Sequence, residues 1–276
     1  MQAQGRELEI FKAVDLTAPE LVHHPRSLQD LHERTKDVLM IRNMFSQIEA
    51  ETVVQRLENG EIQFTRFEYP WGHVFGRVLF GSKPDLPAYF ADAEKFRRDC
   101  RTLFSGVTDF ETRVEEILRT VSGGLPIEVP QGPDGQSYSP ATIRFMKNGH
   151  ELPIHCGKQF LNVLPSINHH AMIVDYADQL SYFVMLDPPV SGGELVLYDV
   201  PWPENYQGVL NGNKADHEVI ARSIKIPLAL RAGDMIIFNG GRIWHSVARV
   251  HGLRPRKTIG GFIAYAVDHR RFYYWS

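Results

Sequence analysis

Residues 152–157 read Leu-Pro-Ile-His-Cys-Gly, and 152–156 are one of several short β-type runs that follow Pro140. Turn residues separate these runs, as is typical of consecutive strands. The other runs are 141–146, 181–186, 194–198, 235–238, 243–250 and 257–267. About seven short strands at this spacing predict a sandwich, a barrel or a jelly roll. We therefore expect a β-rich core over residues 126–276.

The first 125 residues have a different, helix-rich pattern. Ser46 and Glu49 form a capping-box pattern ahead of an apolar run, and Asn59-Gly60 supplies a stop signal. Amphipathic stretches follow at 86–104 and 110–121, before a Pro- and Gly-rich connector at 126–140. These patterns predict an α+β fold in which helices pack on the outer face of a jelly roll. We expect a single domain over residues 1–276, with a helix-rich part at 1–125 and the jelly-roll core at 126–276.

The composition argues against several classes of partner. The 276 residues are 43% hydrophobic and 23% charged, with a formal net charge of −3. This is ordinary for a globular protein and lacks the positive excess that binds a nucleic-acid polymer. The two cysteines form no disulfide framework, and no apolar run is long enough to span a bilayer or to serve as a secretory signal. We expect a cytoplasmic protein whose partner is neither a nucleic-acid polymer nor a membrane.

The residues around His155 suggest a metal site with one ligand missing. In a strand, His155 and Gly157 point to the same face and Cys156 points to the opposite one. A His-x-Asp or His-x-Glu pair followed by a distant second His is the 2-His-1-carboxylate triad of non-haem Fe(II) oxygenases. His245 supplies a second His, in the apolar run 243–247, but glycine stands at the carboxylate position. An iron bound here would therefore have room for another ligand.

Each of these residues also has a plainer interpretation. A single His in a strand is more often a hydrogen-bonded core residue than a metal ligand. Arg254 and Arg256 follow His245 at a spacing that suits a cation for the far carboxylate of a dicarboxylic cosubstrate chelated by the metal. The planar fork of arginine binds a carboxylate through two hydrogen bonds. Taken alone, either arginine is more typically a solvated surface charge.

The chain resembles the Fe(II)/2-oxoglutarate oxygenase superfamily. Within it, the chain is similar to the carrier-protein-independent aliphatic halogenases of hapalindole-type indole alkaloid biosynthesis. The resemblance extends over nearly the whole sequence and implies that the jelly roll is the double-stranded β-helix of that superfamily. The segments that carry it are 135–144, 155–157, 178–183, 192–196, 238–242, 258–262 and 273–276.

The resemblance implies roles for four residues around the metal. His155 and His245 would be the two protein ligands of Fe(II). Gly157 would leave a coordination position at which chloride or bromide binds iron directly. Ser181 matches a serine near the metal that is thought to direct the oxo ligand away from the substrate, so that halogen transfer prevails over hydroxylation.

The same resemblance implies a site for 2-oxoglutarate. Arg256 would hold its distal carboxylate, with Thr258 as a hydrogen-bond donor beside it and Arg144 on an adjacent strand. Arg144 also suits a salt bridge at the edge of the core. The implied reaction consumes 2-oxoglutarate and O2, gives succinate and CO2, and forms an Fe(IV)-oxo that abstracts hydrogen from an unactivated aliphatic C–H. The carbon radical then takes the halide.

The sequence departs from the alkaloid halogenases at several positions that bear on the substrate. Arg77 and Lys158 add positive charge near the implied pocket, and Leu152 is a third candidate substrate contact. Such charges favour an anionic molecule, for instance a nucleotide, over a neutral indole alkaloid, although both side chains also fit plain solvent exposure. The polar stretch 203–221 suits a lid over the site or a disordered insertion.

The leading hypothesis is thus a halogenase acting on a freestanding small molecule that is not tethered to a carrier protein. One alternative is a 2-oxoglutarate-dependent hydroxylase that has lost its carboxylate ligand and holds water in the open position. The other, from a different class, is a non-catalytic jelly-roll binding protein. The set of two histidines and an arginine in one chain argues against the binding protein.

Overall fold

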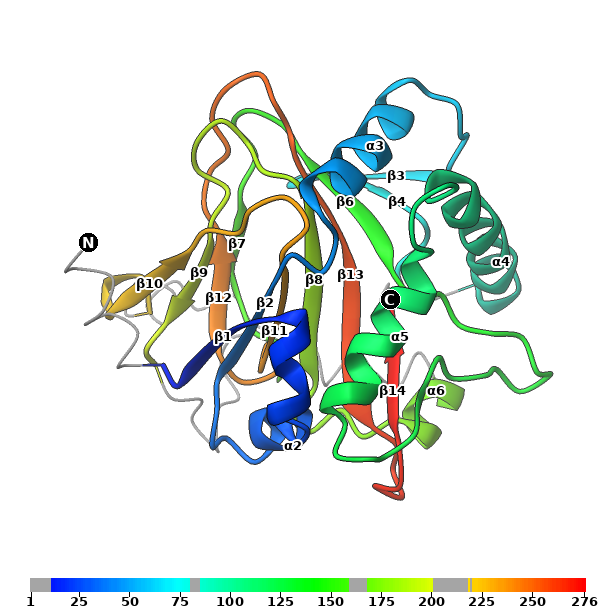
Figure 1. The fold of residues 1–276 in the computed structure, drawn as a ribbon, viewed down its shortest axis with the longest axis vertical. Coiled ribbons are helices and arrows are strands. Elements are labelled where there is room, and N and C mark those ends of the chain that lie inside the picture. Colours follow the sequence, from blue (N-terminus) through cyan, green and yellow to red (C-terminus); the bar gives the residue numbers. More distant parts are fainter. Residues whose placement is uncertain (1–10, 80–84, 159–167, 201–217, 219) are drawn as a thin grey trace.

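Two β-sheets form the centre of the molecule in a computed structural model (Figure 1), which describes residues 11–79, 85–158, 168–200, 218 and 220–276. The larger sheet has the order β1-β2-β11-β8-β13-β6-β4-β3, and β14 and β5 extend it beside β13. The smaller sheet has the order β10-β9-β12-β7. The strands of the larger sheet are β1 (Ala13–Thr17), β2 (Val38–Arg42), β3 (Arg66–Tyr69), β4 (Gly72–Phe75), β5 (Ile127–Glu128), β6 (Thr142–Met146), β8 (Leu180–Asp187), β11 (Met235–Phe238), β13 (Arg256–Tyr265) and β14 (Phe272–Trp275). Those of the smaller sheet are β7 (Leu152–His155), β9 (Leu195–Tyr198), β10 (Lys225–Leu228) and β12 (Trp244–Val247).

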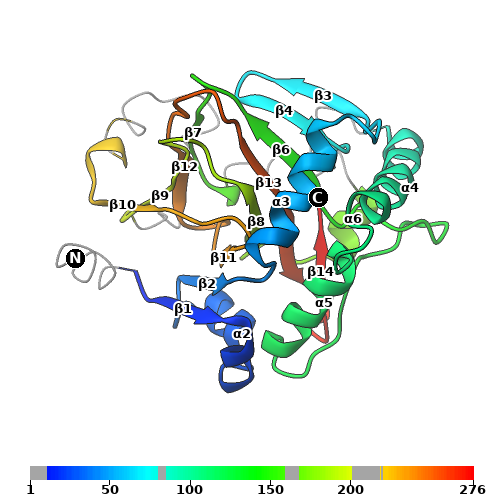
Figure 2. The ribbon, with the colours of Figure 1, turned by 45° about the horizontal axis from the view of Figure 1, so that its top comes forward.

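Helices cover one face of the larger sheet (Figures 1 and 2). They are η1 (Ala18–His23), α2 (Ser27–His32), α3 (Gln47–Glu58), α4 (Leu86–Leu103) and α5 (Phe110–Val121), with the short α6 (Asn168–Ile173) near β14. Apolar side chains of α4 and α5, such as Leu103 and Val114, share a buried cluster with sheet residues such as Ile41, Val184 and Ile259. This packing leaves the opposite face of the larger sheet for the smaller sheet.

The helix signals in the sequence are confirmed. Ser46 caps α3: its hydroxyl accepts from the Glu49 backbone N–H at 3.3 Å, and the Glu49 carboxylate accepts from the Ser46 N–H at 2.7 Å. Gly60 follows the end of the helix with φ at +68°, a conformation that glycine adopts without strain. The amphipathic stretches at 86–104 and 110–121 are α4 and α5. The α+β class expected from these patterns is confirmed.

All seven expected strands are present, and two differences matter. The strand predicted at 152–156 ends at His155, so Gly157 lies beyond it in a turn. The first 125 residues contribute β1 to β4 to the larger sheet as well as helices, and strands from both sides of the connector at 126–140 pair with one another. The stretch 203–221, considered above as a lid, lies outside the described residues except for 218, 220 and 221.

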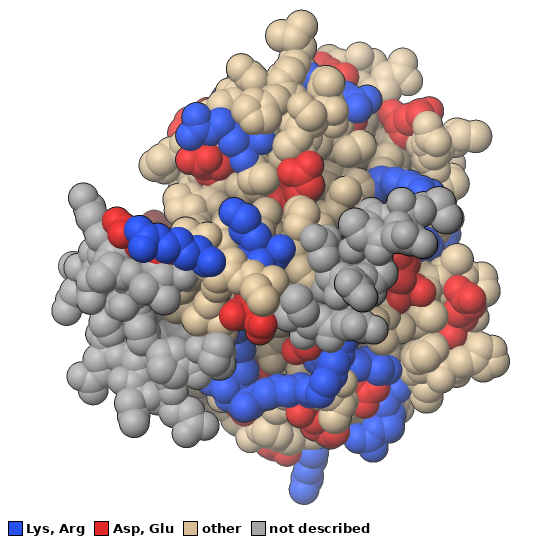
Figure 3. All heavy atoms as spheres, turned by 90° about the vertical axis from the view of Figure 1, so that its left-hand side faces the viewer, with Lys and Arg blue, Asp and Glu red and all other residues tan. Residues whose placement is uncertain are grey.

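The described surface and helices bear on binding to a membrane or to a charged polymer. On the face seen from the left-hand side of Figure 1, basic and acidic side chains are interspersed among the described residues (Figure 3). Within the described part of the chain, the longest helices are too short or too polar to cross a bilayer.

Candidate active site

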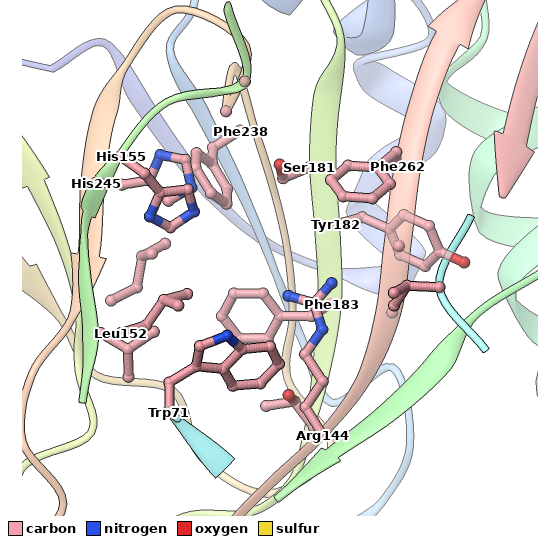
Figure 4. Close-up of a pocket in the computed structure, with 18 of the residues that line it drawn as sticks. Trp71, Arg144, Leu152, His155, Ser181, Tyr182, Phe183, Phe238, His245 and Phe262 are labelled. Atoms are coloured by element: carbon pink, nitrogen blue, oxygen red, sulfur yellow. The ribbon is translucent and has the colours of Figure 1, made fainter. Parts of the chain in front are cut away.

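A cavity of about 490 Å³ lies between the two sheets. Its walls are mainly apolar, and polar side chains enter it at a few places (Figure 4). Such a shape is typical of a small-molecule site, in which apolar walls exclude water and a few polar groups fix orientation. The cavity is lined by Tyr69, Trp71, Val78, Arg144, Met146, Leu152, Pro153, Ile154, His155, Gly157, Tyr176, Gln179, Ser181, Tyr182, Phe183, Leu195, Phe238, Gly240, His245, Val247, Arg256, Thr258, Gly260, Gly261 and Phe262.

The structure brings the two candidate metal ligands together on the smaller sheet. His155 on β7 and His245 on β12 are direct cross-strand partners, and their ring centroids lie 4.2 Å apart. Figure 4 shows both rings side by side on one wall of the cavity. Residues far apart in the sequence therefore present two imidazoles at one point.

Each imidazole is fixed by a hydrogen bond to its own strand. His155 Nδ1 donates to the Pro153 carbonyl and His245 Nδ1 donates to the Ile243 carbonyl, both at 2.8 Å. A carbonyl can only accept, so the proton resides on Nδ1 and the lone pair on Nε2, the form in which histidine binds a metal. Burial, together with the Arg144 charge, lowers the pKa of His155 to about 4, and burial also holds the pKa of His245 well below its usual value. Both rings are thus neutral near pH 7, and they fit a divalent cation.

No third protein ligand accompanies this pair among the described residues. No cluster of three or more His, Cys, Asp or Glu side chains occurs in the described part of the chain. Gly157 lines the cavity beside the histidines, whereas Cys156 is buried in a separate cluster that includes Trp244 and Val196. Cys156 therefore points away from the site, as the strand pattern predicted.

Backbone packs directly against Gly157. Its N–H donates to the Gly240 carbonyl at 2.8 Å, and the next N–H, of Lys158, donates to the Gly241 carbonyl at 2.9 Å. A Cβ at position 157 would lie 2.9 Å from the Gly241 Cα, closer than real Cβ atoms approach backbone. The turn between β11 and β12 thus occupies the space where the first atom of a carboxylate side chain would lie.

Arg256 is a buried cation in the same cavity. Its Nε donates to the Gly193 carbonyl at 2.8 Å, its guanidinium lies 5.0 Å from the ring centre of Phe183, and Thr258 Oγ1 lies 3.5 Å from its Nη1. Burial, and secondarily the charge of Arg144, lowers its pKa to about 9. The side chain is therefore still protonated at neutral pH, but its charge is costly to bury without an anion. This is the arrangement expected of a carboxylate-binding arginine.

Arg144 is the second cation of the cavity. It lies on β6 opposite Thr258 of β13, and its guanidinium is 6.0 Å from the ring centre of Trp71, which stacks on Tyr69. Burial lowers its pKa, and the described residues give it no carboxylate partner. In Figure 4 its side chain extends from β6 into the cavity between Trp71 and Phe183. The salt bridge at the core edge that the sequence also allowed for Arg144 does not form with any described residue.

Ser181 lies on the wall across from the histidines. It is on β8, between Phe238 of β11 and Phe262 of β13 in the pairing of the larger sheet. A Cβ on Gly240 would lie only 2.2 Å from the Ser181 hydroxyl, so the hydroxyl packs against the same turn that covers Gly157. Ser181 and Gly157 thus border one part of the cavity.

The structure separates the three candidate substrate contacts. Leu152 lines the cavity, but Arg77 and Lys158 do not. Arg77 donates to Asp92 of α4 at 2.6 Å and lies over the Phe67 ring, so its charge is already paired. The Lys158 ammonium faces Asp178 at 4.0 Å. The structure therefore does not bring these two cations into the cavity, and each faces a carboxylate outside it.

Several cavity residues had not been singled out from the sequence. Tyr69, Trp71, Val78 and Tyr176 come from segments that are brought to the cavity only by the three-dimensional fold, whereas Phe262 lies on β13. Phe262 could have been found, since strand alternation places it on the same face of β13 as Arg256 and Thr258. The others carry no periodic signal that would relate them to the histidines.

A family model matches residues 10–276 of the chain, and its description is "Carrier-protein-independent halogenase WelO5". The chain belongs to this family. The resemblance suspected from the sequence is confirmed, and members of the WelO5 family act without a carrier protein, as the description states. No curated protein matches the sequence significantly.

Solved structures share the fold of this WelO5-family chain. The crystal structure of an N-substituted L-amino acid dioxygenase from Burkholderia ambifaria AMMD matches with a TM-score of 0.54 and 13% identity, over 90% of each chain. The complex of such a dioxygenase with alpha-KG, from the same organism, matches with a TM-score of 0.53 and 15% identity, again over 90% of each chain. At this identity the likeness concerns the fold alone, and it confirms the jelly-roll core.

Family membership also establishes the class of enzyme. The WelO5-family chain is an Fe(II)/2-oxoglutarate-dependent oxidoreductase whose cofactors are Fe(II), 2-oxoglutarate, O2 and a halide. The cavity is consistent with this class, since neutral imidazoles suit the iron and buried arginines suit a dicarboxylate. The alternative of a non-catalytic binding protein is thereby set aside.

Proposed function

We propose that this enzyme chlorinates or brominates an unactivated aliphatic C–H of a freestanding small molecule. One observation carries the proposal: His155 and His245 form a two-ligand site, and backbone of the turn at Gly240 and Gly241 packs where a third ligand would start at Gly157. A hydroxylase needs no such vacancy, because a carboxylate completes its triad. A halide is an anion of one charge and therefore replaces that carboxylate without changing the charge at the metal.

In this proposal, the chain's own residues hold the cofactors and shape the reaction. His155 and His245 would bind Fe(II), which together with 2-oxoglutarate and O2 supplies the oxidising chemistry for removing hydrogen from an aliphatic carbon. Arg256, aided by Thr258 and Arg144, would bind the distal carboxylate of 2-oxoglutarate. The apolar walls exclude water from the reacting carbon.

Ser181 is the candidate residue for controlling the outcome. Its hydroxyl lies at the wall opposite the histidines and contacts the turn that borders Gly157. Because the choice between halogen and oxygen transfer depends on small differences in position, a hydrogen-bond donor at this wall is suited to direct it. We propose that Ser181 favours transfer of the halogen.

The lining of the cavity bears on the substrate. Trp71, Tyr69, Val78 and Phe262 form flat and apolar walls, which suit a ring system such as an indole alkaloid or a nucleobase. With Arg77 and Lys158 paired elsewhere, Arg144 is the remaining cation in the cavity apart from Arg256 among the described residues. A substrate panel should therefore include neutral indoles and anionic nucleotides.

The test combines a binding signal with product analysis. Anaerobic protein with Fe(II) and 2-oxoglutarate should show a weak visible charge-transfer band, and chloride should shift it. Under O2, the panel should contain a compound that stimulates succinate formation and yields a chlorinated product by mass spectrometry. A band that chloride leaves unchanged, together with hydroxylated product only, would favour the hydroxylase alternative and reject the proposal.

A further inference from the structure

Three cationic side chains converge on Asp178, immediately behind the wall at Gly157. Arg242 Nη2 donates to Asp178 Oδ2 at 3.1 Å, Lys158 Nζ lies 4.0 Å from Oδ1, and Arg34 Nη2 lies 3.9 Å from Oδ2. Among the described residues, Asp178 is the acidic partner in the ion pairs of all three. We call Lys158, Asp178 and Arg242 the cationic cluster, because it contains two positively charged side chains and one negatively charged side chain.

The backbone places the cluster next to the proposed halide position. Lys158 directly follows Gly157, and its N–H donates to the Gly241 carbonyl at 2.9 Å. Arg242 directly follows Gly241, whose N–H donates to the Gln179 carbonyl at 2.7 Å, and Asp178 directly precedes Gln179. All three side chains of the cluster therefore leave the backbone at the wall that borders Gly157.

The cluster is shielded from water. The side chains of Lys158, Asp178 and Arg242 are 12%, 10% and 19% exposed, whereas that of Arg34 is 53% exposed. Charges that are partly buried are screened much less by salt and solvent than exposed ones, so Arg34 contributes little. Glycine backbone of residues 157, 240 and 241 lies between the backbone of the cluster and the cavity.

We propose that the cationic cluster stabilises the halide in the position beside Gly157 by its net positive charge. The inference rests on the proposed function, because it concerns the halide of that reaction. It gives Lys158 a role different from substrate contact: the ammonium supports the anion from behind the wall and does not touch the substrate. A purely structural role, in which Asp178 and Arg242 only fasten the turn, makes a different prediction.

The two roles predict different effects on chloride binding when the Asp178 carboxylate is removed. If net charge matters, removing the ammonium in Lys158→Met weakens chloride binding, whereas removing the carboxylate in Asp178→Asn leaves chloride binding equal or tighter. If the cluster only fastens the turn, loss of Asp178 weakens chloride binding as much as loss of Arg242 does. Lys158→Arg keeps the charge and serves as the matched control.

The experiment is a chloride titration of anaerobic protein loaded with Fe(II) and 2-oxoglutarate, followed by the shift of the charge-transfer band. We expect Lys158→Met to raise the chloride Kd roughly three- to tenfold, as expected for loss of a partly screened charge, and to change the 2-oxoglutarate Kd less. Lys158→Arg should restore the wild-type value. Arg42→Gln, which breaks the 2.6 Å ion pair with Asp234 elsewhere in the larger sheet, should lower stability without changing the chloride Kd.

Each result has a defined meaning. A chloride Kd in Lys158→Met equal to that of the wild type, with the wild-type band shift present, overturns the inference and leaves the proposed function intact. A raised chloride Kd in folded Asp178→Asn also overturns the inference, in favour of a purely structural role for the cluster. A wild-type protein whose band does not respond to chloride rejects the halide site itself, and with it the proposed function. If Asp178→Asn does not fold, as judged by its melting temperature, the comparison of Lys158→Met with Lys158→Arg decides whether the inference holds.

Discussion

Replacing Gly157 with aspartate should convert an open coordination position into an occupied one, and we expect the Gly157→Asp variant to lose halogenation. The substitution has a steric part and a ligand part. A Cβ at this position would lie 2.9 Å from Gly241 Cα and 3.4 Å from the Gly240 carbonyl oxygen. The first distance is well inside the optimal separation of about 3.5–4.0 Å between carbon atoms, so the turn must move. Overpacking of this kind costs about 1–3 kcal/mol.

The alanine variant separates the two parts. Gly157→Ala introduces the same Cβ without a carboxylate, so both variants should lose similar stability, seen as a fall in Tm of about 2–4 °C per kcal/mol. Gly157→Ala should retain reduced chlorination, because the metal position stays open. In Gly157→Asp the carboxylate competes with the halide for iron, and we expect chlorination to fall by a factor of at least about 100, or ~2.7 kcal/mol, with succinate formation continuing.

The assay is product analysis by mass spectrometry in chloride buffer, with succinate measured in parallel and Tm measured for each variant. Weak hydroxylation by Gly157→Asp is compatible with the reasoning. Chlorination by Gly157→Asp at the wild-type level would refute the halide site at Gly157. Equal inactivity of the alanine and aspartate variants would show that the position of the turn matters and the added ligand does not.

Three further predictions concern other parts of the molecule. Arg256→Met should raise the 2-oxoglutarate Kd at least tenfold (about 1.4 kcal/mol), since a buried charge-assisted contact is lost, while Arg254→Met, at a side chain that is 53% exposed, should leave it unchanged in the same anaerobic titration. Ser181→Ala should lower the ratio of chlorinated to hydroxylated product at unchanged Tm; a ratio equal to that of the wild type would remove Ser181 from the mechanism. Burial lowers the pKa of His73 to about 4, so the unfolded chain takes up a proton between pH 6.5 and 4 that the folded chain does not. Metal-free protein should therefore lose stability in urea as pH falls through that window, and His73→Phe, which preserves the stacking on Phe145, should lessen the loss.

Much of the jelly roll could be predicted because its strands carry a local signal. Runs such as 181–186 and 235–238 combine β-branched and aromatic residues with flanking turn residues, and each is a strand. The run at 38–42, Val-Leu-Met-Ile-Arg, is apolar throughout, and periodicity alone does not distinguish such a buried strand from a buried helix. The strands of the β3–β4 hairpin have only four residues each, which is too short for alternation to give a clear signal. The strands of the first 125 residues were therefore missed.

The sequence identified the two histidines that the structure brings together, but it did not indicate the directions of other side chains. His155 and His245 lie in strands, where alternation fixes the face of each side chain. Arg77 and Lys158 lie outside regular strands, so no period indicates which way they point, and the structure pairs them with Asp92 and Asp178. Gly157, singled out from the sequence, lines the cavity beside the two histidines. Its contact with the turn at Gly241 depends on a long-range approach that the sequence does not encode locally.

The position of β2 has a consequence for how the chain acquires its structure. β2, at residues 38–42, pairs with β11, at residues 235–238, and β11 in turn pairs with β8. β2 thus receives this antiparallel neighbour only after the intervening residues 43–234 have been synthesised. Pairings over such sequence distances slow folding, because a long loop must close before the contact forms. Until β11 has been synthesised, the edge of β2 that pairs with it in the fold stays unpaired, and unpaired strand edges make a folding chain prone to aggregate.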